Sequence, residues 1–379
     1  MALKIAITKE TAAAEKRVAA TPDTVKKLCA LGCSIVIEAG AGKSANYLDA
    51  DYETVGAVIS KTAETATKDA DIVLRVQAND KNIIKHLKDN CLLIGLINPY
   101  NNKNLIEEFA QKKVNSFSME LVPRISRAQS MDVLSSQSNL AGYKSVLDAT
   151  EYFDRAMPMM MTAAGTVAPA KVFVMGAGVA GLQAIATARR LGAVVSATDV
   201  RPAAKEQVKS LGASFIAVED DEFKEAESAG GYAKEMSKEY QAKQAALVEE
   251  TIAKQDIVIT TALIPGRPAP KLITEKMISS MKTGSVIVDM AVEAGGNVEG
   301  SIVDQVVEKY GVTIIGHANI ASRLATDASA LYAKNILSLL TLIIKDGDLQ
   351  IDWEDDIIKG IALTKDGQVI HPSFIAKKD

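Results

Sequence analysis

The glycine-rich segment Gly176-Ala-Gly-Val-Ala-Gly181 is the feature that most constrains what this 379-residue chain can fold into. An apolar run at 171–175 lies immediately before it, and an apolar pattern of helical period at 182–191 follows it directly. A strand, a tight glycine turn and a helix in this order are typical of the first βαβ unit of a dinucleotide-binding domain. Because the context matches as well as the spacing, we predict such a domain rather than a glycine-rich turn without a ligand.

Each position of this motif has a physical task. Gly176 permits the tight turn, Gly178 lets the backbone approach a pyrophosphate, and Gly181 allows the helix to pack closely on the strand. Asp199 ends the next predicted strand, where a carboxylate accepts hydrogen bonds from the adenosine ribose and repels a 2′-phosphate. Arg201 lies two residues further on and is a side chain that welcomes a 2′-phosphate. Since Asp199 holds the leading position, we predict NAD(H) as the cofactor.

Short apolar runs alternate with longer amphipathic ones along the chain, which indicates βα units and parallel sheets. The N-terminal third has five strand candidates, at 4–8, 34–38, 72–76, 92–97 and 114–116. A helix is predicted at about 22–31, with Thr21 as its cap, Pro22 at its first position and Gly32 at its end. This third contains no glycine fingerprint for a phosphate.

The rest of the chain contains the inventory of a complete dinucleotide-binding domain. Its six strand candidates are 172–175, 194–198, 214–218, 257–261, 286–290 and 313–316. Long helical patterns at 131–153 and 327–344 flank them. We predict two Rossmann-like, doubly wound parallel-sheet α/β domains joined by long helices. Residues 133–326 form the NAD-binding domain, and residues 1–132 form a discontinuous first domain that 327–379 completes.

Charge and composition exclude several classes of function. Lys and Arg number 43 against 47 Asp and Glu, a net charge of -4, so a broad basic surface for nucleic acid is not expected. The three cysteines lack CxxC spacing and are expected to be buried thiols in a reducing compartment. His86, His317 and His371 form no metal-ligand pattern, so we predict no metal site.

One long uncharged stretch, 156–188, imitates a membrane helix because Lys171 is its only charge. It also contains Pro158, Pro169 and three glycines, which favour a strand, a loop and a helix over a membrane span. The start of the chain is too short in apolar residues for a secretory signal. We therefore predict a chain without a membrane span of its own.

The segment 124–139 is dense in hydrogen-bonding side chains and lies where the two predicted domains join, a place where clefts form. Its candidate functional residues are Arg124, Gln129, Asp132 and Ser135. A polar linker whose Asp or Ser caps the following helix accounts for the same residues. The residues by themselves leave both interpretations open.

A second polar segment, 219–244, contains Gly230, Gly231 and Tyr232 among charged residues. Glycines beside an aromatic side chain suit the hinge and tip of a lid over a ligand. A plain surface loop has the same composition, and composition alone favours the loop.

Seven stretches of the chain closely resemble the NAD(H)-binding component, domain I, of proton-translocating nicotinamide nucleotide transhydrogenase. They are 123–132, 134–142, 159–165, 176–185, 229–236, 260–266 and 291–296. The most specific are Pro-Arg-Ile-Ser-Arg-Ala-Gln-Ser-Met-Asp at 123–132 and the Gly-Gly-Tyr segment. The likeness runs over essentially the whole chain and extends to alanine dehydrogenase, whose two-domain architecture that family shares.

This resemblance implies a Si/Re-specific, proton-translocating NAD(P)+ transhydrogenase, in which hydride passes directly between NADH and NADP+ held on a partner subunit. It implies that Arg124, Gln129, Asp132 and Ser135 surround the nicotinamide and act in catalysis. The implied cofactor-binding residues are Gly176, Gly178, Val179, Gly181, Asp199, Gly231, Tyr232, Gln244 and Leu263. In this interpretation Tyr232 is the tip of the loop that closes over NAD.

Two other classes of function remain as alternatives. An alanine dehydrogenase needs a carboxylate anchor and a proton-transfer group. That family has a Lys where this chain has Arg75, and a histidine on the next strand, whereas 92–99 contains none. Direct hydride transfer needs only distance and alignment, so the missing histidine favours transhydrogenation. A module that senses NAD without catalysis is the third class.

The resemblance also implies partners. These are an NADP-binding subunit and a membrane-spanning subunit, with a second copy of this chain in a homodimer. The expected location is cytoplasmic, peripherally attached to the inner face of the bacterial inner membrane. No nucleic acid is expected as a partner.

Overall fold

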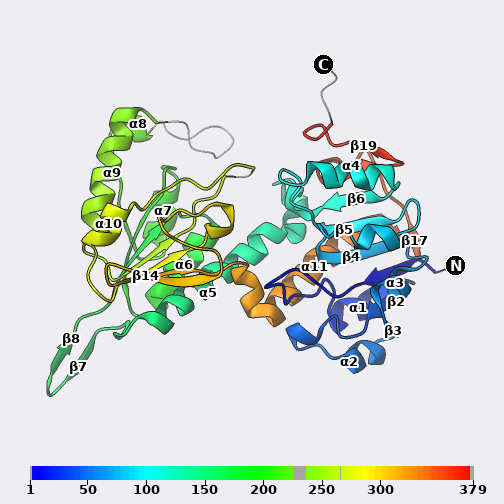
Figure 1. Ribbon diagram of the computed structural model, residues 1–379, viewed down its shortest axis with the longest axis horizontal. Coiled ribbons are helices and arrows are strands. Elements are labelled where there is room, and N and C mark those ends of the chain that lie inside the picture. The colour runs from blue at the N-terminus through cyan, green and yellow to red at the C-terminus, as the bar shows by residue number, and fades with distance from the viewer. Residues whose placement is uncertain (1, 225–235, 265, 376–379) are drawn as a thin grey trace. The chain divides into compact units, whose positions relative to one another are not determined.

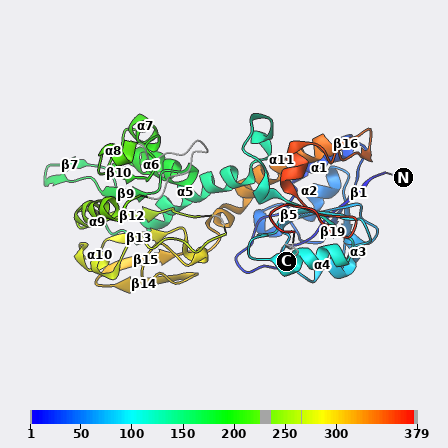
Figure 2. The same ribbon diagram turned by 90° about the horizontal axis from the view of Figure 1, so that it is seen from above.

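The computed structural model describes residues 2–224, 236–264 and 266–375 and divides into two compact units (Figures 1 and 2). Unit 1 comprises Met1–Gln137 and Ala321–Asp379, and unit 2 comprises Ser138–Ile320. Each unit is built on its own mainly parallel sheet with helices on the strand connections. The predicted fold class, two doubly wound α/β domains, is confirmed.

Unit 1 contains an eight-stranded sheet in the order β19-β18-β6-β5-β4-β1-β2-β3. Strands β1 to β6 are parallel, whereas β18 and β19 are antiparallel additions beside β6. The strands are β1 (Lys4–Ile7), β2 (Ser34–Glu38), β3 (Val58–Ser60), β4 (Ile72–Gln77), β5 (Leu92–Leu96), β6 (Asn115–Ser118), β18 (Ala362–Lys365) and β19 (Gln368–Val369). The helices are α1 (Pro22–Ala30), α2 (Asp49–Thr54), α3 (Ala63–Thr67), α4 (Lys103–Gln111), α11 (Ala325–Ile343), α12 (Asp356–Ile361) and the 3₁₀ helix η4 (Ser126–Met131).

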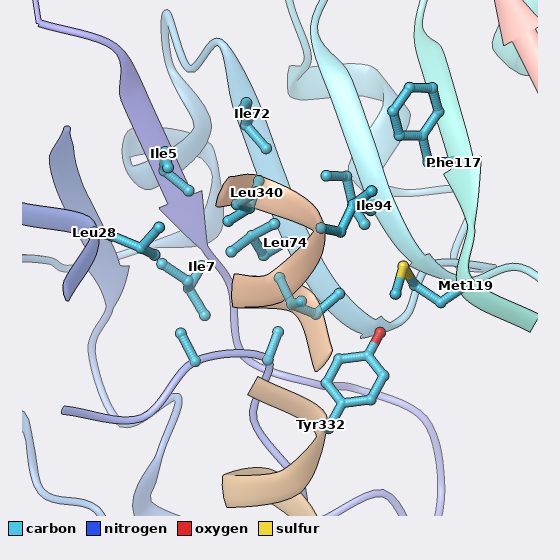
Figure 3. Close-up of a cluster of buried hydrophobic side chains, with 14 of the residues drawn as sticks. Ile5, Ile7, Leu28, Ile72, Leu74, Ile94, Phe117, Met119, Tyr332 and Leu340 are labelled. Carbon is cyan, nitrogen blue, oxygen red and sulfur yellow. The ribbon is translucent and has the colours of Figure 1, made fainter. Parts of the chain in front are cut away.

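The main apolar core of unit 1 lies between one face of this sheet and α11 (Figure 3). Ile5 and Ile7 point to that face because side chains alternate along a strand, and Leu74 of the neighbouring β4 lies beside them. Leu340 and Tyr332 come from α11, and all five side chains are fully buried. The helix that returns the chain to unit 1 therefore forms part of its core.

Unit 2 contains a seven-stranded sheet in the order β11-β10-β9-β12-β13-β15-β14. Its first six strands have the order 3-2-1-4-5-6 that is typical of dinucleotide-binding domains. The strands are β9 (Lys171–Met175), β10 (Val194–Thr198), β11 (Ser214–Phe215), β12 (Ile257–Thr260), β13 (Val286–Asp289), β14 (Gln305–Lys309) and β15 (Val312–Gly316). The helices are α5 (Val133–Tyr152), whose first turn belongs to unit 1, α6 (Val179–Arg190), α7 (Ala204–Ser210), α8 (Asp221–Lys224), α9 (Lys238–Ile252) and α10 (Glu275–Ser280).

Four features of the sheets differ from the sequence-based expectations. Strand β3, the antiparallel edge strand β14, the added pair β18 and β19, and a separate hairpin of β7 (Met160–Thr162) and β8 (Gly165–Val167) were not expected. The strand predicted at 214–218 ends at Phe215, because the backbone amide of Val218 donates to Gln244 Oε1 (2.9 Å) instead of to the sheet. Among the described residues, no helix has the length and apolarity to cross a membrane.

Candidate functional site

The glycine turn of unit 2 joins β9 to α6 with only three intervening residues. Gly176 has φ +101°, a left-handed conformation that an L-residue adopts only with strain. Gly178 is the N-cap of α6 with φ -75°, and having no side chain it leaves the first amides of the helix without a side-chain cap. The turn therefore presents free backbone donors at a helix N-terminus, which is where phosphates bind in proteins.

The three glycines differ in what surrounds them. A Cβ on Gly181 would lie 1.8 Å from the carbonyl oxygen of Gly176, so only glycine permits this helix to pack against the turn. A Cβ on Gly176 would lie 2.5 Å from Thr261 Oγ1. At Gly178, by contrast, nothing lies within 4 Å of the Cβ position. The backbone at Gly178 is thus open to a close approach, and the turn fits a pyrophosphate.

The electrostatics of α6 suit an anion at its start. Its first turn contains no acidic side chain, and Arg189 and Arg190 occupy its last turn. Both features leave the positive end of the helix dipole available at the glycine turn. Gly142 of α5 packs against this first turn, since its Cβ position is 2.1 Å from the carbonyl oxygen of Ala180. Contact with α5 therefore helps to fix the position of the turn.

Asp199, directly after β10, has a buried carboxylate with several donors around it. One oxygen accepts from the amide of Ala177 inside the glycine turn (2.7 Å). Arg201 donates to the carboxylate through its backbone amide, Nε and Nη2, each at 2.9 Å. The two residues that the sequence set against each other are therefore an ion pair, and Asp199 is tied to the turn.

The remaining predicted residues of unit 2 are distributed around the same sheet edge or fall outside the description. Gln244 on α9 donates to Thr198 Oγ1 (3.1 Å) at the end of β10. Leu263 follows β12 and is 56% exposed, unusual for a leucine at the carboxyl edge of a parallel sheet. Gly231 and Tyr232 lie outside the described residues.

Two buried residues that sequence reasoning missed hold the loop after β12. Asn297 is fully buried and exchanges hydrogen bonds with the backbone of Ala262. Asp289, at the end of β13, is also fully buried and accepts from the amides of Ala291, Asn297 and Val298. Their signal in the sequence was a polar residue at a strand end and an Asn in a glycine-rich stretch, which is too common to single out.

In unit 1 the predicted polar residues cluster on η4 and the start of α5. Asp132 accepts from the amide and the hydroxyl of Ser135 (2.9 and 2.5 Å), so it caps α5. The helix-capping interpretation is therefore part of the structure, and the two residues do lie together. Gln129 and Arg124 are exposed, on η4 and just before it.

A partner far along the chain holds this cluster in place. Arg127 of η4 donates through Nη1 and Nη2 to both oxygens of Asp355 (2.7 and 2.8 Å), a fork geometry that fixes orientation. These hydrogen bonds lower the pKa of Asp355 below its ordinary value. Asn335 of α11 donates to the carbonyl of Ser130 at the other end of η4 (2.7 Å). The 3₁₀ helix that carries Gln129 is therefore braced at both ends.

The fold and the glycine turn together define a two-unit α/β protein of the dinucleotide-binding class. Comparison with known proteins agrees. Residues 6–141 match the alanine dehydrogenase/PNT N-terminal domain family, and residues 145–372 match the alanine dehydrogenase/PNT C-terminal domain family. The chain belongs to the alanine dehydrogenase/PNT family.

Individual relatives cover almost the whole chain. The first of the separate chains that make up the NAD(P) transhydrogenase alpha subunit of Rhodospirillum rubrum is 52% identical over 379 residues, covering 98% of this chain and 99% of that protein. The crystal structure of transhydrogenase from Sinorhizobium meliloti has a TM-score of 0.89 at 55% identity and covers 97% of this chain and 100% of that one. An L-alanine dehydrogenase structure has a TM-score of 0.82 at 23% identity, covers 98% of both chains and shows the shared fold.

Proposed function

We propose that this chain is the NAD(H)-binding alpha subunit of a proton-translocating NAD(P)+ transhydrogenase. The observation that carries the proposal is the open, uncapped glycine turn at the start of α6, with the Asp199 carboxylate bound to it. Membership of the family and 52% identity to a transhydrogenase subunit support the same conclusion.

NADH, when bound, supplies the hydride. The amides at Gly178 and Val179 would hold the pyrophosphate, since this helix start has free donors and no acidic side chain. Gly176 and Gly181 give the turn its shape, and Asp199 would accept from the ribose hydroxyls. Gln244, Leu263, Gly231 and Tyr232 would complete the nucleotide site.

The residues of unit 1 would position the nicotinamide. Gln129 is exposed on a braced 3₁₀ helix, which suits a side chain that reaches towards the partner's NADP(H). Asp132 and Ser135 would bind the carboxamide and fix the ring face, with Arg124 beside them. Direct transfer between two nicotinamides needs alignment rather than a proton-transfer group, so exposed, preorganised hydrogen-bonding side chains are sufficient.

The proposed complex contains an NADP-binding subunit, a membrane-spanning subunit and a second copy of this chain, on the cytoplasmic face of the bacterial inner membrane. The hairpin of β7 and β8 supports the dimer. Met159, Met160 and Met161 are 57%, 44% and 76% exposed on a two-stranded sheet that pairs with no other strand. Isolated hairpins are marginally stable in water, and exposed apolar patches mark interaction surfaces. A second copy would cover this one.

The test is a hydride-transfer assay on the chain with and without an NADP-binding partner subunit. We expect transfer from NADH to NADP+ only when the partner is present. L-alanine with NAD+ should give no turnover above background. Robust oxidation of L-alanine by the chain alone would establish the alanine dehydrogenase alternative, and NADH binding without transfer in the complete complex would establish a sensing module.

A further inference from the structure

The carboxyl ends of β1 and β4 form the topological switch point of unit 1. The parallel strands have the order β3-β2-β1-β4-β5-β6, which reverses direction between β1 and β4. Doubly wound sheets bind their ligands outside the carboxyl ends of the strands at such a point. The proposed function assigns nothing to this place, so its occupants need a separate account.

Side chains of the loop after β1 fill this point. The Glu10 carboxylate accepts from the amides of Val76 (2.7 Å) and Gln77 (3.2 Å) at the end of β4. It also accepts from Arg75 Nη2 at 3.2 Å, and both side chains of this ion pair are 3% exposed. A carboxylate of the chain itself therefore occupies the anion-binding position at the strand ends.

A second carboxylate, Glu15, occupies the fork of Arg17. Arg17 Nε and Nη2 donate to the two oxygens of Glu15 at 2.8 and 2.6 Å, the bidentate geometry with which arginine binds a free carboxylate. The side chain of Glu15 is fully buried and that of Arg17 is 4% exposed. Gln77 Nε2 donates to the same carboxylate (3.0 Å), and Gln137 Oε1 accepts from Arg17 Nη1 (2.8 Å).

The charge of Arg17 persists despite its burial. Burial lowers the pKa of a guanidinium, but the hydrogen bonds and the charge of Glu15 outweigh this and hold the Arg17 pKa above its ordinary value. A buried arginine in a fixed position is a carboxylate site by its chemistry. In this chain the carboxylate comes from the residue two positions earlier.

The same place contains polar atoms whose bonding capacity the described chain does not use. Thr8 Oγ1 and Arg75 Nε are both buried and have no hydrogen-bond partner among the described residues. Thr8 directly follows β1, and the register of β1 with β4 places it beside Arg75. Tyr332, whose hydroxyl points to the strand ends in Figure 3, donates to the carbonyl of Arg75 (2.8 Å). Spare buried polar atoms are typical of ligand sites rather than of apolar cores.

We propose that Glu15 is the specificity-determining residue of the unit 1 switch point: its carboxylate occupies Arg17 from within and thereby excludes small carboxylate anions. Removal of this carboxylate turns the switch point into a binding site for a small monocarboxylate. The proposal concerns unit 1 alone and stands whether or not the chain transfers hydride.

The test is chemical rescue of Glu15→Ala in the full chain. Alanine lacks the Cγ atom and the carboxylate of Glu15, and acetate supplies both. The variant should have a lower Tm than the wild type because Arg17 loses its counter-charge. Sodium acetate should restore the Tm along a one-site binding curve, with a rise of roughly 2–4 °C at about ten times the dissociation constant. Wild-type chain should respond to acetate no more than to sodium chloride of equal ionic strength.

Two controls separate this site from general effects. Acetamide has the size of acetate without its charge and should not rescue Glu15→Ala. Gln137→Ala removes another partner of Arg17 but leaves the Glu15 carboxylate, so its Tm should fall without any response to acetate. If Glu15→Ala is insoluble in chloride buffer, the readout becomes its refolding yield from urea, which acetate should raise and chloride should not. A Tm or yield of Glu15→Ala that acetate raises no more than chloride does means that the ion pair is purely structural, and the proposal is wrong.

Discussion

Units 1 and 2 have the same parallel strand order and differ in the connection that follows the first strand. In unit 2, α6 begins three residues after β9, and the glycine turn between them is open. In unit 1, residues 8–21 separate β1 from α1, and this longer loop brings two carboxylates back over the strand ends. One topology thus produces the same sheet edge twice, and the loop decides whether that edge accepts a ligand.

The contrast is also one of charge. At Gly178 the chain offers backbone amides and a helix dipole with no side chain in front of them, which suits an external anion. At Glu10 the amides of Val76 and Gln77 are already bound to an internal anion. The fold alone therefore does not define a nucleotide site. A short glycine connection does.

The largest expected effect comes from closing the open turn of unit 2. In Gly181→Ala the new methyl group would overlap the carbonyl oxygen of Gly176, 1.8 Å away. Overpacking of this kind costs about 1–3 kcal/mol and forces the backbone to move. We expect a lower Tm and an NADH affinity reduced by roughly a hundredfold, since each 1.4 kcal/mol is about tenfold in binding. Calorimetric titration and thermal unfolding measure the two quantities.

Gly178→Ala is the matched control for Gly181→Ala. Its φ of -75° is ordinary for alanine, and nothing lies within 4 Å of the new Cβ. The Tm should therefore stay unchanged, while the methyl group obstructs the approach of the pyrophosphate and lowers NADH affinity by about tenfold. Unchanged affinity in Gly178→Ala would mean that the phosphates do not bind at this turn.

Gln129→Asn and Asp132→Asn test whether unit 1 aligns the nicotinamide rather than binds the nucleotide. Misplacement by about 1 Å can cost on the order of a hundredfold in rate, whereas most binding energy should come from the pyrophosphate and adenosine. We expect single-turnover hydride transfer in the reconstituted complex to fall by about that factor, with NADH affinity changed less than about threefold.

The choice of asparagine at 132 keeps the structural role of this residue. Asp132 caps α5 through the amide of Ser135, and asparagine is an equally good N-cap. A fall in Tm would therefore point to a lost carboxylate interaction other than the cap. If Gln129→Asn lost affinity and rate in equal proportion, the segment would be a polar helix-capping linker only.

Elements with a strong local signal could be predicted from the sequence. The apolar strand before Gly176, and Thr21, Pro22 and Gly32 around α1, act within a few residues of each other, so their pattern is visible along the chain. Strand β14 was missed because an edge strand needs only one apolar face and alternates weakly. The hairpin of β7 and β8 was missed because its residues are exposed and leave no burial pattern.

The site shows the same limit more sharply. The positions of the glycines and of Asp199 follow from spacing, and the structure has them on one turn. The pairing of Asp199 with Arg201 was not predicted, because two charges two residues apart can point anywhere once a strand ends. Arg127 and Asp355 lie 228 positions apart, and such a contact has no signature in a single sequence.

Asp199 and Arg201 sharpen the comparison between the units, because here the internal ion pair sits beside an open site instead of filling it. NADH should bind more tightly than NADPH by roughly tenfold, or about 1.4 kcal/mol. Asp199→Ala should remove this preference, since the repulsion of a 2′-phosphate is lost and Arg201 is freed from its partner. Arg201→Ala should enlarge the preference, because the carboxylate is then unneutralised. Equal affinities of the wild type for NADH and NADPH by calorimetry would overturn the cofactor assignment.

The smallest expected effect concerns the brace that holds η4 in unit 1. Hydrogen bonds from Arg127 lower the pKa of Asp355, so the pair stabilises the folded chain at pH values above the unfolded pKa of about 3.9. This contribution is lost as the pH falls through the lowered value. Arg127→Ala should therefore be less stable than the wild type in urea unfolding at pH 7, and the gap should narrow below about pH 4. Because the Arg127 side chain is 48% exposed, salt should shrink the gap as well. Lys27→Ala removes the exposed pair of Lys27 with Asp23 and should show a smaller gap at every pH. A gap for Arg127→Ala that stays constant down to pH 3 and in high salt would mean that packing of the arginine, not its charge, fixes the segment that carries Gln129.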